Sequence, residues 1–146
     1  VDIPAKTTID HRPYNVVALL RGSDPILSRE YIVIESHLDG AVGTRAVNGD
    51  DIYNSADDNA SGSAGTLAIA EALAAGPRPK RSLLFIWDSG EERGLWGTRF
   101  FVSRPPVPLE QIVALINVDM IGANRAPGSP DADAAGSDAP APPEKE

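Results

Sequence analysis

Runs of almost entirely apolar residues constrain the fold of this chain more than any other feature of its sequence. Residues 31–35 read YIVIE, residues 82–87 read SLLFIW and residues 112–118 read IVALINV, while a further run covers residues 15–20. Short runs rich in β-branched residues predict strands, and strands that are apolar on both sides predict burial on both faces. We therefore predict an α/β fold with a mostly parallel sheet flanked by helices.

Two helices are expected between these strands. Residues 61–75 form the longer one, with Ser61 as a candidate N-terminal cap and a Gly-Pro pair directly after its last residue. The face expected to be buried consists of Leu67, Ile69, Ala70 and Leu73. A shorter helix is expected over residues 95–103, because two consecutive prolines follow it.

The composition of the chain changes after residue 122. Residues 123–146 contain five of the 13 prolines and no Val, Ile, Leu or aromatic residue. Such a segment has too little apolar surface to offset the entropy that ordering would cost. We therefore expect residues 1–122 to form the folded domain and residues 123–146 to form a disordered tail or a truncated insertion.

Charge and composition exclude several classes of function. The chain carries 13 Lys+Arg against 21 Asp+Glu, for a net charge of −8, and so lacks the basic stripe that binding to nucleic acid requires. No apolar run is long enough to cross a bilayer, so membrane insertion is not expected. The absence of cysteine excludes thiolate zinc sites and cysteine nucleophiles. The oligomeric state is not indicated.

Ionisable side chains follow the expected strands at the points where these end. His37, the pair Glu91 and Glu92, and Asp119 each come shortly after an apolar run, and Asp58 comes just before the longer helix. Because ligands of open α/β sheets bind at the carboxyl ends of the strands, we expect these groups to converge. One imidazole with several carboxylates suits a divalent ion, and zinc is the usual choice for hydrolysis.

Four motifs carry a resemblance to a known family. SHLDG, SADDNASG, DSGEERGLWGT and NVDM occur in this order, and the chain over residues 14–122 resembles the co-catalytic zinc aminopeptidases of peptidase family M28. The resemblance implies that residues 1–122 form a partial M28-like peptidase domain with a zinc-exopeptidase-like (phosphorylase/hydrolase-like) fold, which is incomplete here. It also implies a hydrolase that acts on peptides with two zinc ions and a metal-bridged water.

The same resemblance implies a role for each candidate site residue. Asp58 would bridge two zinc ions, His37 and Asp119 would complete one site, and Glu92 would serve the other. Glu91 would be the general base that takes a proton from the bridging water.

Three neighbouring residues carry further expectations. Asp39, two residues after His37, is placed to orient the imidazole. The resemblance implies a cis peptide bond before Asn59. Asp57 is expected to be solvated or to cap the backbone locally.

One departure from the family pattern affects the expected activity. The second zinc site of the family needs a later histidine, and the sequence contains none after Asp119; the other histidine, His11, comes before the first strand. We therefore expect the N-terminal portion of a catalytic domain, cut inside a Pro/Ala-rich insertion and inactive by itself.

Several readings of the function stay open at this stage. The favoured one is a zinc-dependent exopeptidase of the aminopeptidase type. A non-catalytic protein-binding module of the same fold, or a carboxypeptidase or glutaminyl-cyclase variant, is the alternative. Family habit suggests a secreted or periplasmic location.

Overall fold

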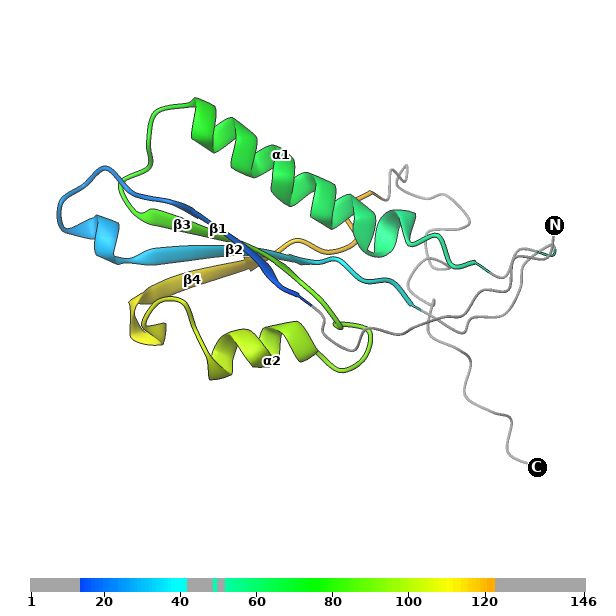
Figure 1. Ribbon diagram of the computed structural model, residues 1–146. Helices are drawn as coiled ribbons and strands as arrows, with labels where there is room; N and C mark the ends of the chain where they lie inside the picture. Colours follow the sequence, from blue (N-terminus) through cyan, green and yellow to red (C-terminus); the bar gives the residue numbers. More distant parts are fainter. Residues whose placement is uncertain (1–13, 42–48, 50–51, 123–146) are drawn as a thin grey trace, which may run out of the picture.

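Four strands form one sheet in the part of the chain that the computed structural model describes, which is residues 14–41, 49 and 52–122 (Figure 1). They are β1 (Val16–Leu20), β2 (Tyr31–His37), β3 (Ser82–Asp88) and β4 (Ile112–Asn117), in the order β1-β3-β2-β4. β2 runs parallel to both β3 and β4, whereas β1 pairs antiparallel with β3. The predicted α/β fold with a mostly parallel sheet is confirmed.

Two α-helices cover opposite faces of this sheet, as Figure 1 shows. They are α1 (Gly62–Ala75) and α2 (Trp96–Ser103). Short helical turns are η1 (Leu27–Arg29), η2 (Ala56–Ser61) and η3 (Leu109–Gln111). None of the described helices combines the length and the apolar character that crossing a membrane would require. The expected tail, residues 123–146, lies outside the described residues.

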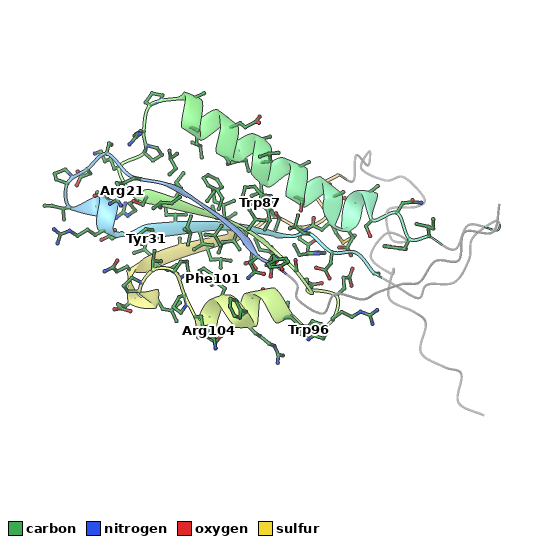
Figure 2. All side chains as sticks on the ribbon, in the orientation of Figure 1. Arg21, Tyr31, Trp87, Trp96, Phe101 and Arg104 are labelled. Carbon is green, nitrogen blue, oxygen red and sulfur yellow. The ribbon has the colours of Figure 1, made fainter. Side chains whose placement is uncertain are left out.

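The core consists of one apolar cluster on each face of the two central strands. On the side of α2, Phe101 packs against residues of β2 and β3 that include Val33 and Leu84. On the side of α1, Leu73 packs against a second cluster that contains Phe85. Figure 2 labels Phe101 on α2, below the sheet in that view, and Trp87 between the sheet and α1. The burial predicted for β2 and β3 is thus confirmed.

The burial predicted for the outer strands is wrong. Val113, Leu115 and Ile116 of β4 are each about half exposed, at 51–55% of their surface, and four of the five residues in β1 are also exposed. β1 and β4 each pair with a single strand among the described residues, and the helices pack over the central pair instead. An apolar run alone does not distinguish a central strand from an outer one.

The buried side of α1 also differs from the prediction. Leu67 and Ile69 are exposed, whereas Ala70 and Leu73 pack against the core as expected. The stripe that faces the sheet continues through Thr66, which is fully buried, because residues three or four positions apart share one side of a helix. Ser61 has helical backbone angles and forms no side-chain cap.

Candidate metal centre

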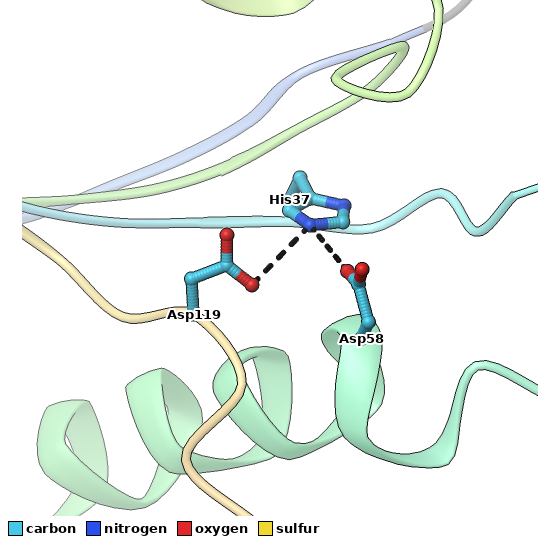
Figure 3. A group of neighbouring side chains, drawn as sticks. All are labelled: His37, Asp58 and Asp119. Carbon is cyan, nitrogen blue, oxygen red and sulfur yellow. Dashed lines mark ion pairs between the residues drawn. The ribbon is translucent and has the colours of Figure 1, made fainter. Parts of the chain in front are cut away.

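Three of the predicted ligands lie together at the carboxyl ends of the parallel strands. His37 ends β2, Asp58 belongs to η2 and Asp119 follows β4. His37 Nε2 lies 3.1 Å from Asp58 Oδ1 and 3.6 Å from Asp119 Oδ1, as Figure 3 shows. One nitrogen or oxygen atom from each residue lies within 4.8 Å of the others, so the group could hold a metal ion.

The surroundings of His37 suit a bound cation, because the side-chain atoms that meet there are all potential metal ligands. Its Nδ1 donates a hydrogen bond of 2.9 Å to the carbonyl of Asp39, so in the neutral imidazole Nε2 carries the lone pair. This Nε2 is buried, has no hydrogen bond of good geometry and faces acceptor oxygens. A metal ion at this point would be bound by the lone pair and by the carboxylates together.

The pKa of His37 reflects both its burial and the carboxylates and carbonyl around it. Burial, the largest single influence, opposes protonation of the ring. The hydrogen bond to Asp39 and the charge of Asp119 lead the effects that nevertheless raise the pKa of His37. The carbonyl of Asp39 and the charge of Asp119 thus both favour positive charge at this point of the site.

Asp39 holds a second part of the site in addition to the imidazole that its spacing predicts. Its backbone carbonyl accepts the hydrogen bond from His37 Nδ1 and so orients the imidazole, and its Oδ1 lies 3.7 Å from the same nitrogen. The carboxylate accepts hydrogen bonds from three successive backbone N–H groups, those of Gly90 at 2.8 Å, Glu91 at 3.0 Å and Glu92 at 3.2 Å. Asp39 therefore fixes the loop after β3, which carries both glutamates.

Glu91 and Glu92 lie beside the group of three ligands rather than within it. Burial raises the pKa of the Glu91 carboxyl, and nearby aspartates add to this rise against the opposing charge of His37. Burial also raises the pKa of Glu92, and the charge of Asp58 raises it further. Glu92 Oε1 is buried without a hydrogen-bond partner. Both carboxyls are thus within electrostatic reach of the predicted ligands.

The prediction that Asp57 is solvated or caps the backbone locally did not include its contact with the loop that carries Asp119. Asp57 Oδ1 accepts a hydrogen bond of 2.8 Å from the backbone N–H of Gly122, on the loop that carries Asp119. Asn59 is buried and also contacts this loop, and the expected cis peptide bond between Asp58 and Asn59 is confirmed. A signal was available in the sequence, because polar residues flank Asp58 at positions 57, 59 and 61.

The fold and this site together define an α/β protein with a candidate centre for a divalent metal. The sequence model of peptidase family M28 matches residues 15–139, and the chain belongs to this family. The match extends past residue 122, where the tail or insertion is expected to begin.

Curated relatives agree with this assignment. The chain is 35% identical to the leupeptin-inactivating enzyme 1 of Streptomyces exfoliatus over 111 residues, which is 75% of this chain and 23% of that protein. It is 34% identical to an aminopeptidase of Pseudomonas aeruginosa, over 84% of this chain and 20% of that protein. A probable zinc metalloprotease of Pyrenophora tritici-repentis is 33% identical, over 84% of this chain and 24% of that protein. The chain thus spans roughly a fifth to a quarter of the length of these relatives.

Proposed function

We propose that this chain contributes the active site of a zinc-dependent exopeptidase of the aminopeptidase type, which acts on peptides. The observation that carries the proposal is the buried lone pair of His37, which faces the carboxylates of Asp58 and Asp119. Family membership supports hydrolysis of peptide bonds, and the names of relatives include aminopeptidase and zinc metalloprotease.

The proposed ligands form two sites, of which one has three protein ligands and the other has two. His37, Asp58 and Asp119 offer three protein ligands, the number that open zinc sites commonly use. Asp58 and Glu92 would begin a second site that shares the Asp58 carboxylate, and we propose two zinc ions in the active enzyme. When bound, zinc polarises the scissile carbonyl and lowers the pKa of a water molecule.

Glu91 is proposed as the general base of the reaction. It lies on the loop that Asp39 fixes, next to Glu92, so it can take a proton while its neighbour binds the metal. Burial raises the pKa of Glu91, which makes the carboxylate a stronger proton acceptor than an exposed one. The same carboxyl can then return the proton to the leaving amine.

Chelation and restoration of zinc test the proposal. The protein is expressed in the form that its gene encodes, and hydrolysis of an aminoacyl 4-nitroanilide is followed before chelation, after it and after zinc is added back. We expect the rate to fall with chelation and to recover with zinc. The Nα-acetylated substrate is the control, because an aminopeptidase needs a free amino group. A hydrolysis rate that does not change on chelation would contradict the zinc mechanism. An acetylated substrate that is hydrolysed as fast as the free one would contradict the aminopeptidase assignment.

A further inference from the structure

Alternate side chains of the segment around Asp58 hold the backbone of the loop around Asp119. We call the side chains of Asp57, Asn59 and Ser61 the loop clamp. Each one bonds a main-chain group of residues 118–122, whereas Asp58 lies between them and faces His37. The bonds run from Asn59 Nδ2 to Val118 O (3.1 Å), and from the N–H groups of Met120, Ile121 and Gly122 to Asn59 Oδ1 (3.3 Å), Ser61 Oγ (3.0 Å) and Asp57 Oδ1 (2.8 Å).

Asn59 forms the buried centre of the loop clamp. Its side chain is 2% exposed, and both ends of its amide are used. Besides its contacts with the loop, Asn59 Oδ1 accepts a hydrogen bond of 3.0 Å from Gly62 N–H, at the start of α1. One amide therefore ties the first turn of α1 to the residues on both sides of Asp119.

Steric contacts show how closely the two segments approach. A Cβ atom added to Gly62 would clash with Asn59 Oδ1 and with the carbonyl oxygen of Val118. At Gly65, it would lie 2.5 Å from the side chain of Ile121. At Gly62 only glycine leaves room, because a Cβ atom would meet the backbone of Val118; the loop is therefore packed against α1 as well as hydrogen-bonded to its start.

The loop clamp opposes a repulsion that the site itself creates. Asp58 and Asp119 offer oxygens within 4.8 Å of each other, and like charges at such a distance favour separation of the segments that carry them. Four hydrogen bonds hold the segments together before any ion is bound. Ligands that are already in place lose less freedom when the metal binds.

We propose that Asp57, Asn59 and Ser61 are positioning residues, which set the separation of Asp58 and Asp119 and thereby the affinity and geometry of the metal centre. This inference rests on the proposed function, since it assigns a metal to that site. None of the three is proposed to contact the metal.

The test uses the two outer members of the loop clamp. Their bonds to Ile121 and Gly122 are exposed, so Asp57→Ala and Ser61→Ala leave the buried amide of Asn59 intact and the fold in place. We expect each variant to bind Zn²⁺ about 10–100-fold more weakly, measured by competition with a chromophoric chelator on the protein as its gene encodes it. The visible spectrum of the Co²⁺-loaded protein should also change, because it reports the geometry of the ligands.

Conservative variants distinguish positioning from charge or general stability. Asp57→Asn keeps an oxygen acceptor and removes the charge, and Ser61→Thr keeps the hydroxyl, so both should restore an affinity close to that of the wild type. Ser103→Ala removes a hydroxyl that bonds only its own helix, at Phe100, and should leave zinc affinity unchanged. A wild-type protein that binds no Zn²⁺ would refute the proposed function itself. Normal zinc binding with unchanged affinity and Co²⁺ spectrum in both alanine variants would overturn the role of the loop clamp.

Discussion

At the scale of single residues, two of the proposed ligands, His37 and Asp58, have neighbours in sequence that fix the backbone around the site. Asp39 follows His37 by two residues and holds the loop of Glu91 and Glu92 through three N–H groups. Asp57 and Asn59 flank Asp58 and hold the loop of Asp119. The chemistry thus depends on groups that alternate, in the sequence, between facing the site and bonding the backbone.

Substitution of Glu91 tests its role as general base. Glu91→Gln removes the proton acceptor and leaves the proposed ligands in place, so we expect zinc content to stay near the wild-type value. Turnover should fall by about 10²–10⁴-fold, the usual contribution of such a group. Zinc is measured by mass spectrometry and turnover with the aminoacyl 4-nitroanilide. Glu110→Gln, an exposed change on η3, is the control; equal rates for Glu91→Gln and the wild type would remove Glu91 from the mechanism.

A second carboxyl gives a prediction for the pH dependence of stability. Burial raises the pKa of Glu35, and the charge of Asp88 raises it further, although the hydroxyl of Thr98 opposes this rise. A carboxyl with a raised folded-state pKa contributes stability below its ordinary pKa of 4.5, and loses that contribution as the pH rises through the folded-state value. Ionised Glu35 is therefore expected to destabilise the protein at neutral pH.

Thermal unfolding at two pH values checks this expectation. Glu35→Gln removes the charge and keeps an acceptor for Thr98, so this variant should unfold at a higher temperature than the wild type near pH 7, with a chelator present. The advantage should shrink towards about pH 4, where Glu35 is protonated. The exposed Glu71→Gln should change stability by no more than about 0.5 kcal/mol. A gain for Glu35→Gln that is the same at both pH values would contradict the assignment.

The sequence predicted that the proposed ligands would lie together, whereas it did not predict most of the contacts that hold the backbone around them. His37 and Asp119 follow apolar runs, and the topology of parallel strands brings such positions to one edge of the sheet. Asp57 bonds the backbone of Gly122, 65 residues further along the chain. The polar residues at alternate positions 57, 59 and 61 are visible in the sequence, but their spacing does not indicate which distant main-chain group each of them bonds.

At the scale of elements, most of the buried apolar side chains belong to the central strands, and the outer surfaces of the helices and strands are largely exposed. Leu84 of β3 is 2% exposed and contacts residues of β2 and α2, whereas Leu67 of α1 is 51% exposed. The sequence predicted both residues in their elements, and burial on both sides for β3. The buried face that it predicted for α1 is right at Ala70 and Leu73 and wrong at Leu67 and Ile69, because the leucines are equally apolar and only the packing distinguishes them.

A matched pair of leucine substitutions measures this difference. Leu84→Ala should lower the free energy of unfolding by about 2–5 kcal/mol, because it leaves a cavity in a closely packed cluster. Leu67→Ala should change it by about 0.5 kcal/mol or less, because its side chain is mostly in solvent. Chemical denaturation gives both values. A large loss for Leu67→Ala would mean that this side of α1 is covered in the folded protein.

At the scale of the whole molecule, the proposed metal links distant segments and should therefore stabilise the fold. The ligands come from the end of β2, from η2 and from the residue pair after β4, so an ion at this point joins three parts of the chain. A ligand that binds only the folded state adds about 2.7 kcal/mol when its concentration is 100 times its Kd. An ion bound at the carboxyl ends of the strands is therefore expected to stabilise the folded sheet.

Zinc should therefore raise the midpoint of thermal unfolding, and the rise should depend on His37. We expect a clear increase for the wild type in excess Zn²⁺ and a much smaller one for His37→Ala. Calorimetry with and without a chelator gives both shifts, and Glu110→Gln again serves as the matched control. Equal shifts in the wild type and in His37→Ala would place the stabilising ion elsewhere on the molecule.

The central claim is that zinc binds between His37, Asp58 and Asp119. Anomalous diffraction from a crystal grown with Zn²⁺, recorded on both sides of the zinc absorption edge, tests it most directly. The account predicts an anomalous peak about 2.0–2.2 Å from His37 Nε2 and from an oxygen of each aspartate. A map without a peak at these residues, or with its zinc bound only elsewhere, would contradict it.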